Sequence, residues 1–177
     1  IDTIYGLRRA VTGQMRLRAE AIHPRTPKDA IDAGIVLVPR DRRHDGLVLP
    51  MTVSENVNLA TLDAVSRLGL EDRSAAQAQA QTQITALDVR PPGPNNVARQ
   101  LSGGNQQKVV LGRWLVKKAD VYLLDEPTIG VDVGARSEIY ALVDELAKAG
   151  AGVIVSSSDP AELIGICDRI AVLMRGQ

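Results

Sequence analysis

The chain has 177 residues, about one domain, and 45% of them are hydrophobic, so a sizeable core is possible. That core must be mainly aliphatic, because phenylalanine is absent, and the lone cysteine excludes an internal disulfide. The 21 basic and 21 acidic residues balance, which argues against a nucleic-acid binder driven by positive charge, and no apolar run approaches the ~20 residues of a membrane span.

The first 34 residues predict a short strand and a short helix. Met15 and Leu17 alternate with polar neighbours, as in a half-buried strand. Thr26 is a helix N-cap followed by a first-turn proline, and Gly34 is a helix-ending glycine, so a short helix is expected between them. The apolar residues at the beginning of the chain have helical spacing: Ile1, Ile4 and Tyr5.

The middle of the chain is predicted to be nearly all helix. A compact apolar strand over 35–38 leads into a strongly charged loop over 39–46. Residues 52–55, Thr-Val-Ser-Glu, form a capping box that begins a helix. A second helix is expected over about 72–87, and Pro-Pro-Gly-Pro at 91–94 breaks the pattern.

Helices and strands alternate after residue 100. The expected order is a helix over 101–118, a strand over 121–124, a helix over about 135–148, a strand over 153–155, a helix over about 160–166 and a strand over 170–174. Such alternation is typical of a parallel sheet. We therefore predict an α/β protein whose strand–helix core is interrupted by a helical insertion.

The predicted helix at 101 begins with the sequence Leu-Ser-Gly-Gly-Asn-Gln-Gln-Lys. Ser102 occupies the N-cap position, where the first helical amides have no partner within the helix. The two glycines let the backbone approach a ligand, and exposed amides at the positive end of a helix bind anions. A simple capped helix is the alternative for a lone Ser-Gly-Gly. The candidate phosphate-binding residues are Ser102, Gly103, Gly104, Asn105 and Gln106.

Two acidic residues follow the next predicted strand. The run 121–124 is short, continuous and apolar, as in a central parallel strand, and ligands of open α/β sheets bind beyond the carboxyl ends of such strands. At that end Asp125 is expected to hold Mg²⁺ through water, and Glu126 to polarise the attacking water as general base. An isolated Asp-Glu pair would be interpreted as a cap or a surface turn, but the phosphate-binding pattern upstream favours catalysis.

In this order and spacing, residues 101–108 and 121–127 resemble the signature and Walker B motifs of an ABC-type ATPase. Residues 128–132 resemble the D-loop of these ATPases, with Asp132 at the aspartate position. On sequence alone, a turn before a helix is the alternative interpretation of Gly130 and Asp132.

Nearly the whole chain is similar to the second nucleotide-binding half of monosaccharide ABC importer ATPases of the ribose, galactose, arabinose and xylose type. Segments 33–47, 51–56 and 132–135 resemble that family specifically. The resemblance implies a P-loop NTPase-like (RecA-like) core with an all-helical subdomain. The implied parts are 1–46 (partial core), 47–118 (helical subdomain ending in the signature helix) and 119–177 (core with Walker B and D-loop).

The Gly-Lys-Ser/Thr turn of a P-loop is missing, since none of the five lysines follows a glycine. The chain also begins at Ile1 without methionine and stops directly after a predicted strand. We therefore expect a truncated fragment without Walker A, inactive alone, and in relatives the P-loop lies just upstream of residue 1.

Two residues depart from the general ABC pattern. A glutamine that contacts Mg²⁺ usually follows the strand at 35–38, and a histidine that contacts the γ-phosphate follows the strand at 153–157; here the matching residues are Arg40 and Ser158. Arginine has no acceptor and cannot ligate a metal, and serine lacks the charge and reach of imidazole. We expect the ATP site on this half's own P-loop to be impaired, and the signature motif to contribute more, by completing the site on a partner half.

The resemblance implies that ATP and Mg²⁺ are bound and that the protein is the ATP-hydrolysing component of a monosaccharide importer at the cytoplasmic face of the inner membrane. The implied partners are the other nucleotide-binding half (in the same polypeptide or a dimer), membrane permease subunits contacted through residues 40–56 with Arg42 and Arg43, and indirectly a periplasmic sugar-binding protein, with no nucleic acid.

Two alternative functions stay open. One is a non-catalytic regulatory half, supported by Arg40 and Ser158, and the other is a soluble ABC ATPase not attached to a transporter.

Overall fold

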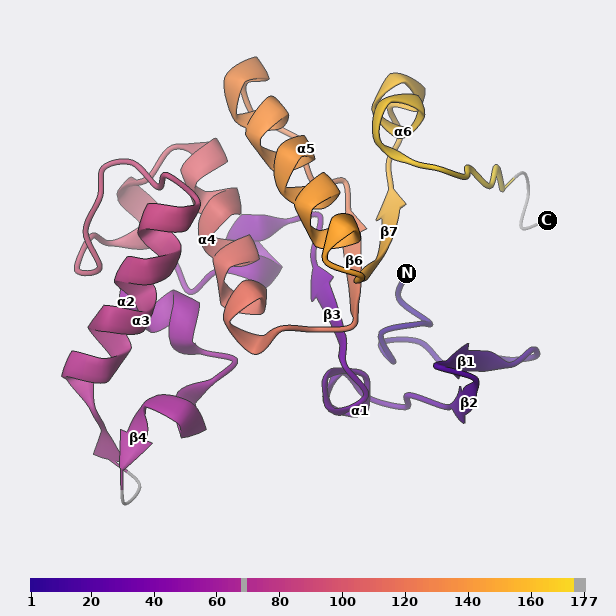
Figure 1. Ribbon diagram of the computed structural model, residues 1–177, viewed down its shortest axis with the longest axis horizontal. Helices are drawn as coiled ribbons and strands as arrows, with labels where there is room; N and C mark the ends of the chain where they lie inside the picture. The colour runs from indigo at the N-terminus through magenta and orange to yellow at the C-terminus, as the bar shows by residue number, and fades with distance from the viewer. Residues whose placement is uncertain (68–69, 174–177) are drawn as a thin grey trace.

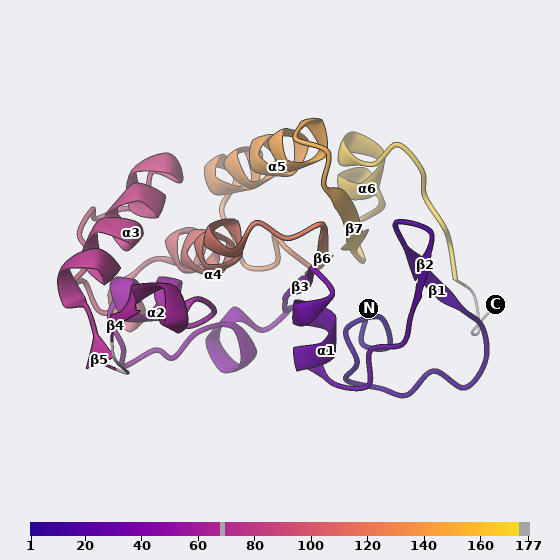
Figure 2. The same cartoon turned by 60° about the horizontal axis from the view of Figure 1, so that its bottom comes forward.

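The computed structural model describes residues 1–67 and 70–173, and it places a parallel sheet between helices, beside a mainly helical lobe (Figures 1 and 2). In chain order the elements are β1 (Met15–Leu17), β2 (Glu20–Ile22), α1 (Pro27–Asp32), β3 (Ile35–Val38), the π-helical turn η1 (Arg42–Gly46), α2 (Val53–Asn58), the 3₁₀ turn η2 (Leu62–Val65), β4 (Ser66–Arg67), β5 (Leu70–Glu71), α3 (Arg73–Ala86), the 3₁₀ turn η3 (Ala98–Gln100), α4 (Gly103–Lys117), β6 (Val121–Asp125), α5 (Val133–Lys148), β7 (Gly152–Ser156) and α6 (Pro160–Ile166). The α/β class and the helical insertion are therefore as predicted. No helix in the described part of the chain is long and apolar enough to cross a membrane.

The central sheet has the order β3-β6-β7, with all three strands parallel. Val38 pairs with Leu124, and Leu124 pairs with Val155, so the three strands end together at one edge. That shared edge is where the sequence places its polar candidates, because each of the three strands is followed directly by a loop that carries one or more of them.

The two faces of the sheet belong to different apolar clusters. One face packs against helices α2 to α5, and it is formed by Val36, Val38, Tyr122 and Leu124. The opposite face packs against α1 and the beginning of the chain, and it is formed by Ile35, Leu37 and Leu123. Alternation of side chains along a strand explains why consecutive residues divide between the two clusters.

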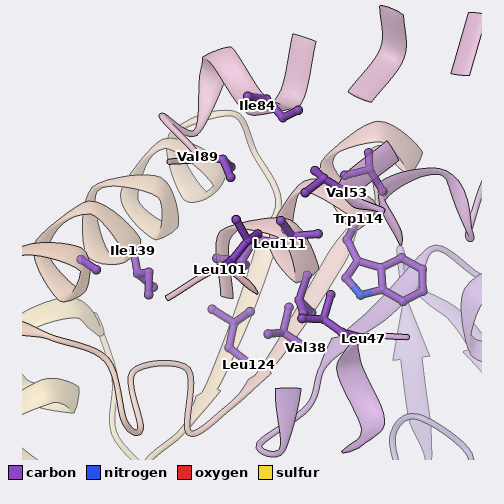
Figure 3. Packing of buried hydrophobic residues seen from close by; sticks show 14 of the residues in the cluster. Val38, Leu47, Val53, Ile84, Val89, Leu101, Leu111, Trp114, Leu124 and Ile139 are labelled. Atoms are coloured by element: carbon purple, nitrogen blue, oxygen red, sulfur yellow. The ribbon is translucent and has the colours of Figure 1, made fainter. Parts of the chain in front are cut away.

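Aliphatic side chains dominate the larger cluster (Figure 3). Leu111 of α4 and Leu124 of β6 lie at its centre and are almost fully buried. Trp114 belongs to the same cluster, one turn of α4 beyond Val110. The helix that begins at the candidate phosphate-binding motif is thus anchored along its length in the core, which fixes the position of its N-terminal tip.

Three departures from the predictions have physical explanations. The first residues close in turns rather than a helix, because Gly6 (φ +79°) brings the backbone so near Thr26 that a Cβ would lie 2.6 Å from the Thr26 carbonyl oxygen. The mainly helical middle also contains the antiparallel pair β4–β5, and β2 pairs with β1. Residues 170–173 do not form the predicted strand, and residue 174 lies outside the described residues. In the described structure β7 is an edge strand that pairs only with β6, and residues 170–173 do not add to its free edge.

The capping box of α2 gives a prediction about pH. The backbone amide of Thr52 donates to the Glu55 carboxylate at 2.7 Å, and this bond, with one from the Thr52 hydroxyl, holds the pKa of Glu55 below its ordinary value of 4.5. Glu55→Gln is expected to lower the free energy of unfolding by about 0.5 kcal/mol at neutral pH, because the charge at the helix start is lost.

The sign of the pH effect follows from the lowered pKa. The carboxylate stabilises the fold fully above pH 4.5 and progressively less as the pH falls through the folded-state value. The free energies of unfolding of the Glu55→Gln variant and the unmutated protein, measured in urea, should therefore become equal at low pH. Glu71→Gln, at an exposed position of β5, is the control, and a difference that persists at low pH would contradict the assignment.

Candidate functional site

The N-terminal tip of α4 presents hydrogen-bond donors to solvent. The exposed Ser102 is the N-cap, and its Oγ accepts hydrogen bonds from the side-chain amide of Asn105 at 2.9 Å and from its backbone amide at 3.5 Å. Because the hydroxyl accepts twice, its own proton is left to donate outward. The first amides of this 15-residue helix, at Gly103 and Gly104, lie at the positive end of its dipole. The tip therefore has the donor arrangement of an anion site.

A hollow of about 260 Å³ lies beside this tip, between the first turns of α4 and α5. Its lining includes Ser102, Gly104 and Asn105 from α4, together with Asp132. Asp132 is the N-cap of α5, and its carboxylate accepts the backbone amide of Ala135 at 3.0 Å. The structure thus brings the signature-like and D-loop-like motifs to one cavity. Asp132 also performs the capping role that the sequence left as an alternative.

A buried lysine in the same lining was not among the predicted site residues. The Lys108 ammonium lies 2.5 Å from the carboxylate of Glu138 and donates to the carbonyl of Asp88 at 2.9 Å, with only 8% of its side chain exposed. Lys108 follows Gly104 by four residues and so lies on the same helical face. That spacing was the signal in the sequence that could have identified it.

Gln106 is not exposed as Ser102 is. Its side chain is buried, and its amide nitrogen donates to the carbonyl of Ala98 at 3.2 Å. Asn105 instead joins the tip to the loop after α3, because its side-chain oxygen accepts the backbone amide of Arg90 at 2.6 Å. The Gln106 side chain is therefore engaged within the fold and does not line the hollow, and we leave it out of the proposed phosphate-binding set.

The acidic pair lies at the carboxyl end of β6, beside the end of β7. Glu126 has φ +47°, a left-handed conformation that costs a non-glycine residue on the order of 1 kcal/mol. Its backbone amide donates to the carbonyl of Ser156 at 2.8 Å, and its carboxylate accepts the backbone amide of Ser158 at 2.9 Å. The loop after β7 thus orients the Glu126 side chain through its backbone, so the identity of the side chain at 158 does not affect this contact.

Asp125 has the features of a magnesium ligand. Its half-buried carboxylate makes no hydrogen bond or ion pair with other described residues, and it sits at the strand edge. No cluster of three metal-binding side chains occurs in the described parts of the chain. Mg²⁺ is commonly bound by one or two carboxylates with water and substrate phosphates, so a single aspartate fits this chemistry.

The basic residues after β3 point in different directions. Arg40 is exposed at the end of the strand, on the same sheet edge as Glu126. Arg43 is also exposed, as expected for a residue that contacts another protein. Arg42 is turned inward, and burial, with a smaller effect from the Arg43 cation, lowers its pKa below the ordinary value. The guanidinium of Arg42 donates to two backbone carbonyls of the loop before α5, so this residue is not presented for an external contact as predicted.

Sequence comparison identifies one protein family. The family model described as ABC transporter matches residues 1–129. The chain is 44% identical over 176 residues to the ribose import ATP-binding protein RbsA of Pseudomonas putida, covering 99% of this chain and 34% of that protein. It is 46% identical over 172 residues to the arabinose import ATP-binding protein AraG of Pseudomonas fluorescens, covering 97% and 34%. The chain thus spans about a third of the length of the curated relatives that it matches.

Solved structures support the same fold. A nucleotide-free ATP-binding cassette from an ABC transporter superposes with a TM-score of 0.81 at 21% identity, covering 99% of this chain and 71% of that one. The dimeric post-hydrolysis state of the ATP-binding cassette MJ0796, bound to ADP and Pi, gives a TM-score of 0.71 at 23% identity, covering 91% and 69%. The arrangement of strands and helices is therefore that of an ATP-binding cassette.

Proposed function

Because the chain belongs to the ABC transporter family, we propose that it is part of the ATP-hydrolysing component of a monosaccharide importer, and that the tip of α4 completes an ATP site on a partner nucleotide-binding half. The observation that carries the proposal is the capped start of α4, where Ser102 is exposed, Gly103 is half-buried, and the buried Gly104 lines the hollow beside the tip. The import of ribose or arabinose is supported by the names of the relatives.

Each site residue has a role in this proposal. The Ser102 hydroxyl and the amides of Gly103 and Gly104 donate to the terminal phosphate oxygens of an ATP held by the partner half. Glu126 orients a water at the strand edge and accepts its proton. Asp125 holds Mg²⁺ through water, and the ion neutralises charge on the phosphates.

The ATP site that the α4 tip completes on the partner half and the ATP site on this half's own P-loop are expected to differ in activity. Ser158 offers a backbone amide to Glu126 but has no imidazole for the γ-phosphate, and Arg40 has no lone pair for a metal. These two residues favour a second candidate function, a regulatory half that binds nucleotide between halves without hydrolysing it on its own P-loop. Both functions are compatible in one transporter, because a single competent site suffices for turnover.

The expected partners follow from this role. The chain pairs with a second nucleotide-binding half, and a pair of cassettes is observed in the dimeric MJ0796 structure. Permease subunits anchor the pair at the cytoplasmic face of the inner membrane, and a periplasmic sugar-binding protein acts through them. The exposed Arg43 belongs to the surface proposed to meet the permease.

Hydrogen exchange tests the proposal without a mutation. In the complete gene product that carries this chain, ATP with Mg²⁺ is expected to slow amide exchange at 103 and 104 about tenfold or more, because a bound phosphate accepts these hydrogen bonds. The amide of Gly165, in α6 and away from the tip, serves as the internal reference. Nucleotide binding without protection at 103 and 104 would contradict the role in trans.

A further inference from the structure

The guanidinium of Arg42 lies where three segments of the site meet. Its Nη1 donates to the carbonyl of Ile129 at 2.7 Å, and its Nη2 donates to the carbonyl of Gly130 at 3.2 Å. A Cβ placed on Gly103 would lie 2.6 Å from Nη2 and 2.9 Å from the Gly130 carbonyl oxygen. The arginine therefore fills the space between the loop before α5 and the tip of α4.

Local structure holds this guanidinium in place. The Asp41 side chain accepts the backbone amides of Arg43 and His44, each at 3.0 Å, and thereby caps η1. The turn also packs against α4, since a Cβ on Gly46 would lie 3.1 Å from a methyl group of Val110. The backbone that carries Arg42 is thus fixed to the same helix whose tip its side chain reaches.

The carbonyl groups are arranged to receive a planar fork. Gly130 has φ +64°, a turn conformation in which the carbonyls of residues 129 and 130 both accept from one guanidinium. The Nε of Arg42 is buried without a partner in the described structure. A lysine carries its three donors on one nitrogen atom, so it cannot reproduce the two separate nitrogens of the planar fork that reach these two carbonyls. The site therefore uses the shape of arginine, not only its charge.

We propose that Arg42 is a positioning residue that holds the loop 126–132 against the tip of α4. It thereby fixes the spacing between the anion-binding amides at 103 and 104 and the residues Glu126 and Asp132 at the two ends of the loop. Its effect on ATP chemistry rests on the proposed function. The contact of Arg42 with the loop does not depend on the proposed function, because it is formed within this chain.

Hydrogen exchange in the complete gene product, without nucleotide, measures directly how firmly Arg42 holds the loop. The amides of Ile129 and Val131 are protected by turn hydrogen bonds within the loop. Arg42→Ala is expected to raise their exchange rates about tenfold, because two charge-assisted hydrogen bonds are lost. The matched control is Arg43→Ala, which removes the same charge from the adjacent exposed position and should change these rates less than about twofold.

Chemical rescue distinguishes positioning from a general loss of stability. Millimolar ethylguanidinium is expected to restore loop protection in Arg42→Ala and to leave Arg43→Ala unchanged, because only the first variant leaves a cavity of guanidinium shape. If Arg42→Ala fails to fold, Arg42→Lys takes its place and is expected to raise exchange at the same two amides. Equal exchange rates in the Arg42 variant and the Arg43 variant would overturn the proposal.

ATP turnover then tests the consequence. Arg42→Ala should lower kcat about tenfold with KM nearly unchanged, because the loop is misplaced while the partner's nucleotide pocket is intact. Unchanged kcat alongside increased loop exchange would overturn the inferred effect on turnover. If the unmutated protein hydrolyses no ATP, the proposed function fails, and the exchange and rescue experiments still decide whether Arg42 holds the loop.

Discussion

Ser102→Arg is expected to lower ATP turnover of the complete gene product at least about a hundredfold, which is the usual effect of removing a donor to developing negative charge. The variant loses the hydroxyl that donates outward from the α4 tip, and the bulk of arginine enters the hollow of about 260 Å³ beside it. The lost cap itself costs about 1 kcal/mol of stability. The main effect is therefore on the anion site and not on folding.

Two variants sharpen this prediction. Ser102→Thr keeps the hydroxyl and the cap, and it should retain most of the turnover. Glu126→Gln should lower turnover less than Ser102→Arg, because Glu126 serves the site expected to be impaired by Arg40 and Ser158. Coupled ATPase assays of the assembled transporter give all three values. Loss of turnover in Glu126→Gln together with near-normal turnover in Ser102→Arg would contradict the proposed asymmetry.

Gly104→Ala is expected to destabilise the protein by about 1–3 kcal/mol and to weaken the site, because it overpacks the contact between α4 and α5. A Cβ at 104 would lie 2.6 Å from the Cβ of Ala135, and that atom has no flexible side chain by which to move away. The two helices must separate for the methyl group to fit, and the tip moves with α4. Urea unfolding and the ATP-dependent protection of the tip measure the two effects.

Gly134→Ala is the matched control. Gly134 is the second residue of α5, as Gly104 is of α4, and the nearest atom to a Cβ there is an Asp132 carboxylate oxygen at 3.4 Å. This variant should be neutral or gain up to about 1 kcal/mol, because alanine favours the helix. The double variant Gly104→Ala with Ala135→Gly should recover part of the lost stability. If Gly104→Ala costs the same stability with alanine or glycine at position 135, the contact with Ala135 is not the cause of the loss.

Local signals in the sequence predicted most of the elements that position the site. The apolar run 35–38 is β3, and the caps at Thr26, Thr52 and Ser102 each begin the expected helix. These signals are reliable because a cap hydrogen-bonds within its own turn, and an apolar strand needs only a buried environment. The resemblance to ABC ATPases is confirmed as family membership.

Contacts between distant segments could not be predicted from local patterns in the sequence. The run 170–173 has strand composition, but a strand also needs pairing with a neighbour, and in the described structure these residues do not pair with the free edge of β7. Gln106 belongs to the signature-like motif by sequence, yet it is buried and donates to the carbonyl of Ala98, because α4 is covered by other segments from Gln106 to Gly112. Arg42 was expected to contact a permease subunit, but in the fold its guanidinium donates to the carbonyls of residues 129 and 130.

The sequence by itself determined the chemical groups available to this protein: a helix that begins with a serine cap and two glycines, an apolar strand that ends in two carboxylates, and the order of both along the chain. Only the tertiary structure decided which polar side chains face the cavity and which hold the framework. The physical reason is that hydrogen-bonding potential belongs to each residue, whereas exposure and the choice of partner depend on segments that lie far apart in the chain and meet only when the core forms.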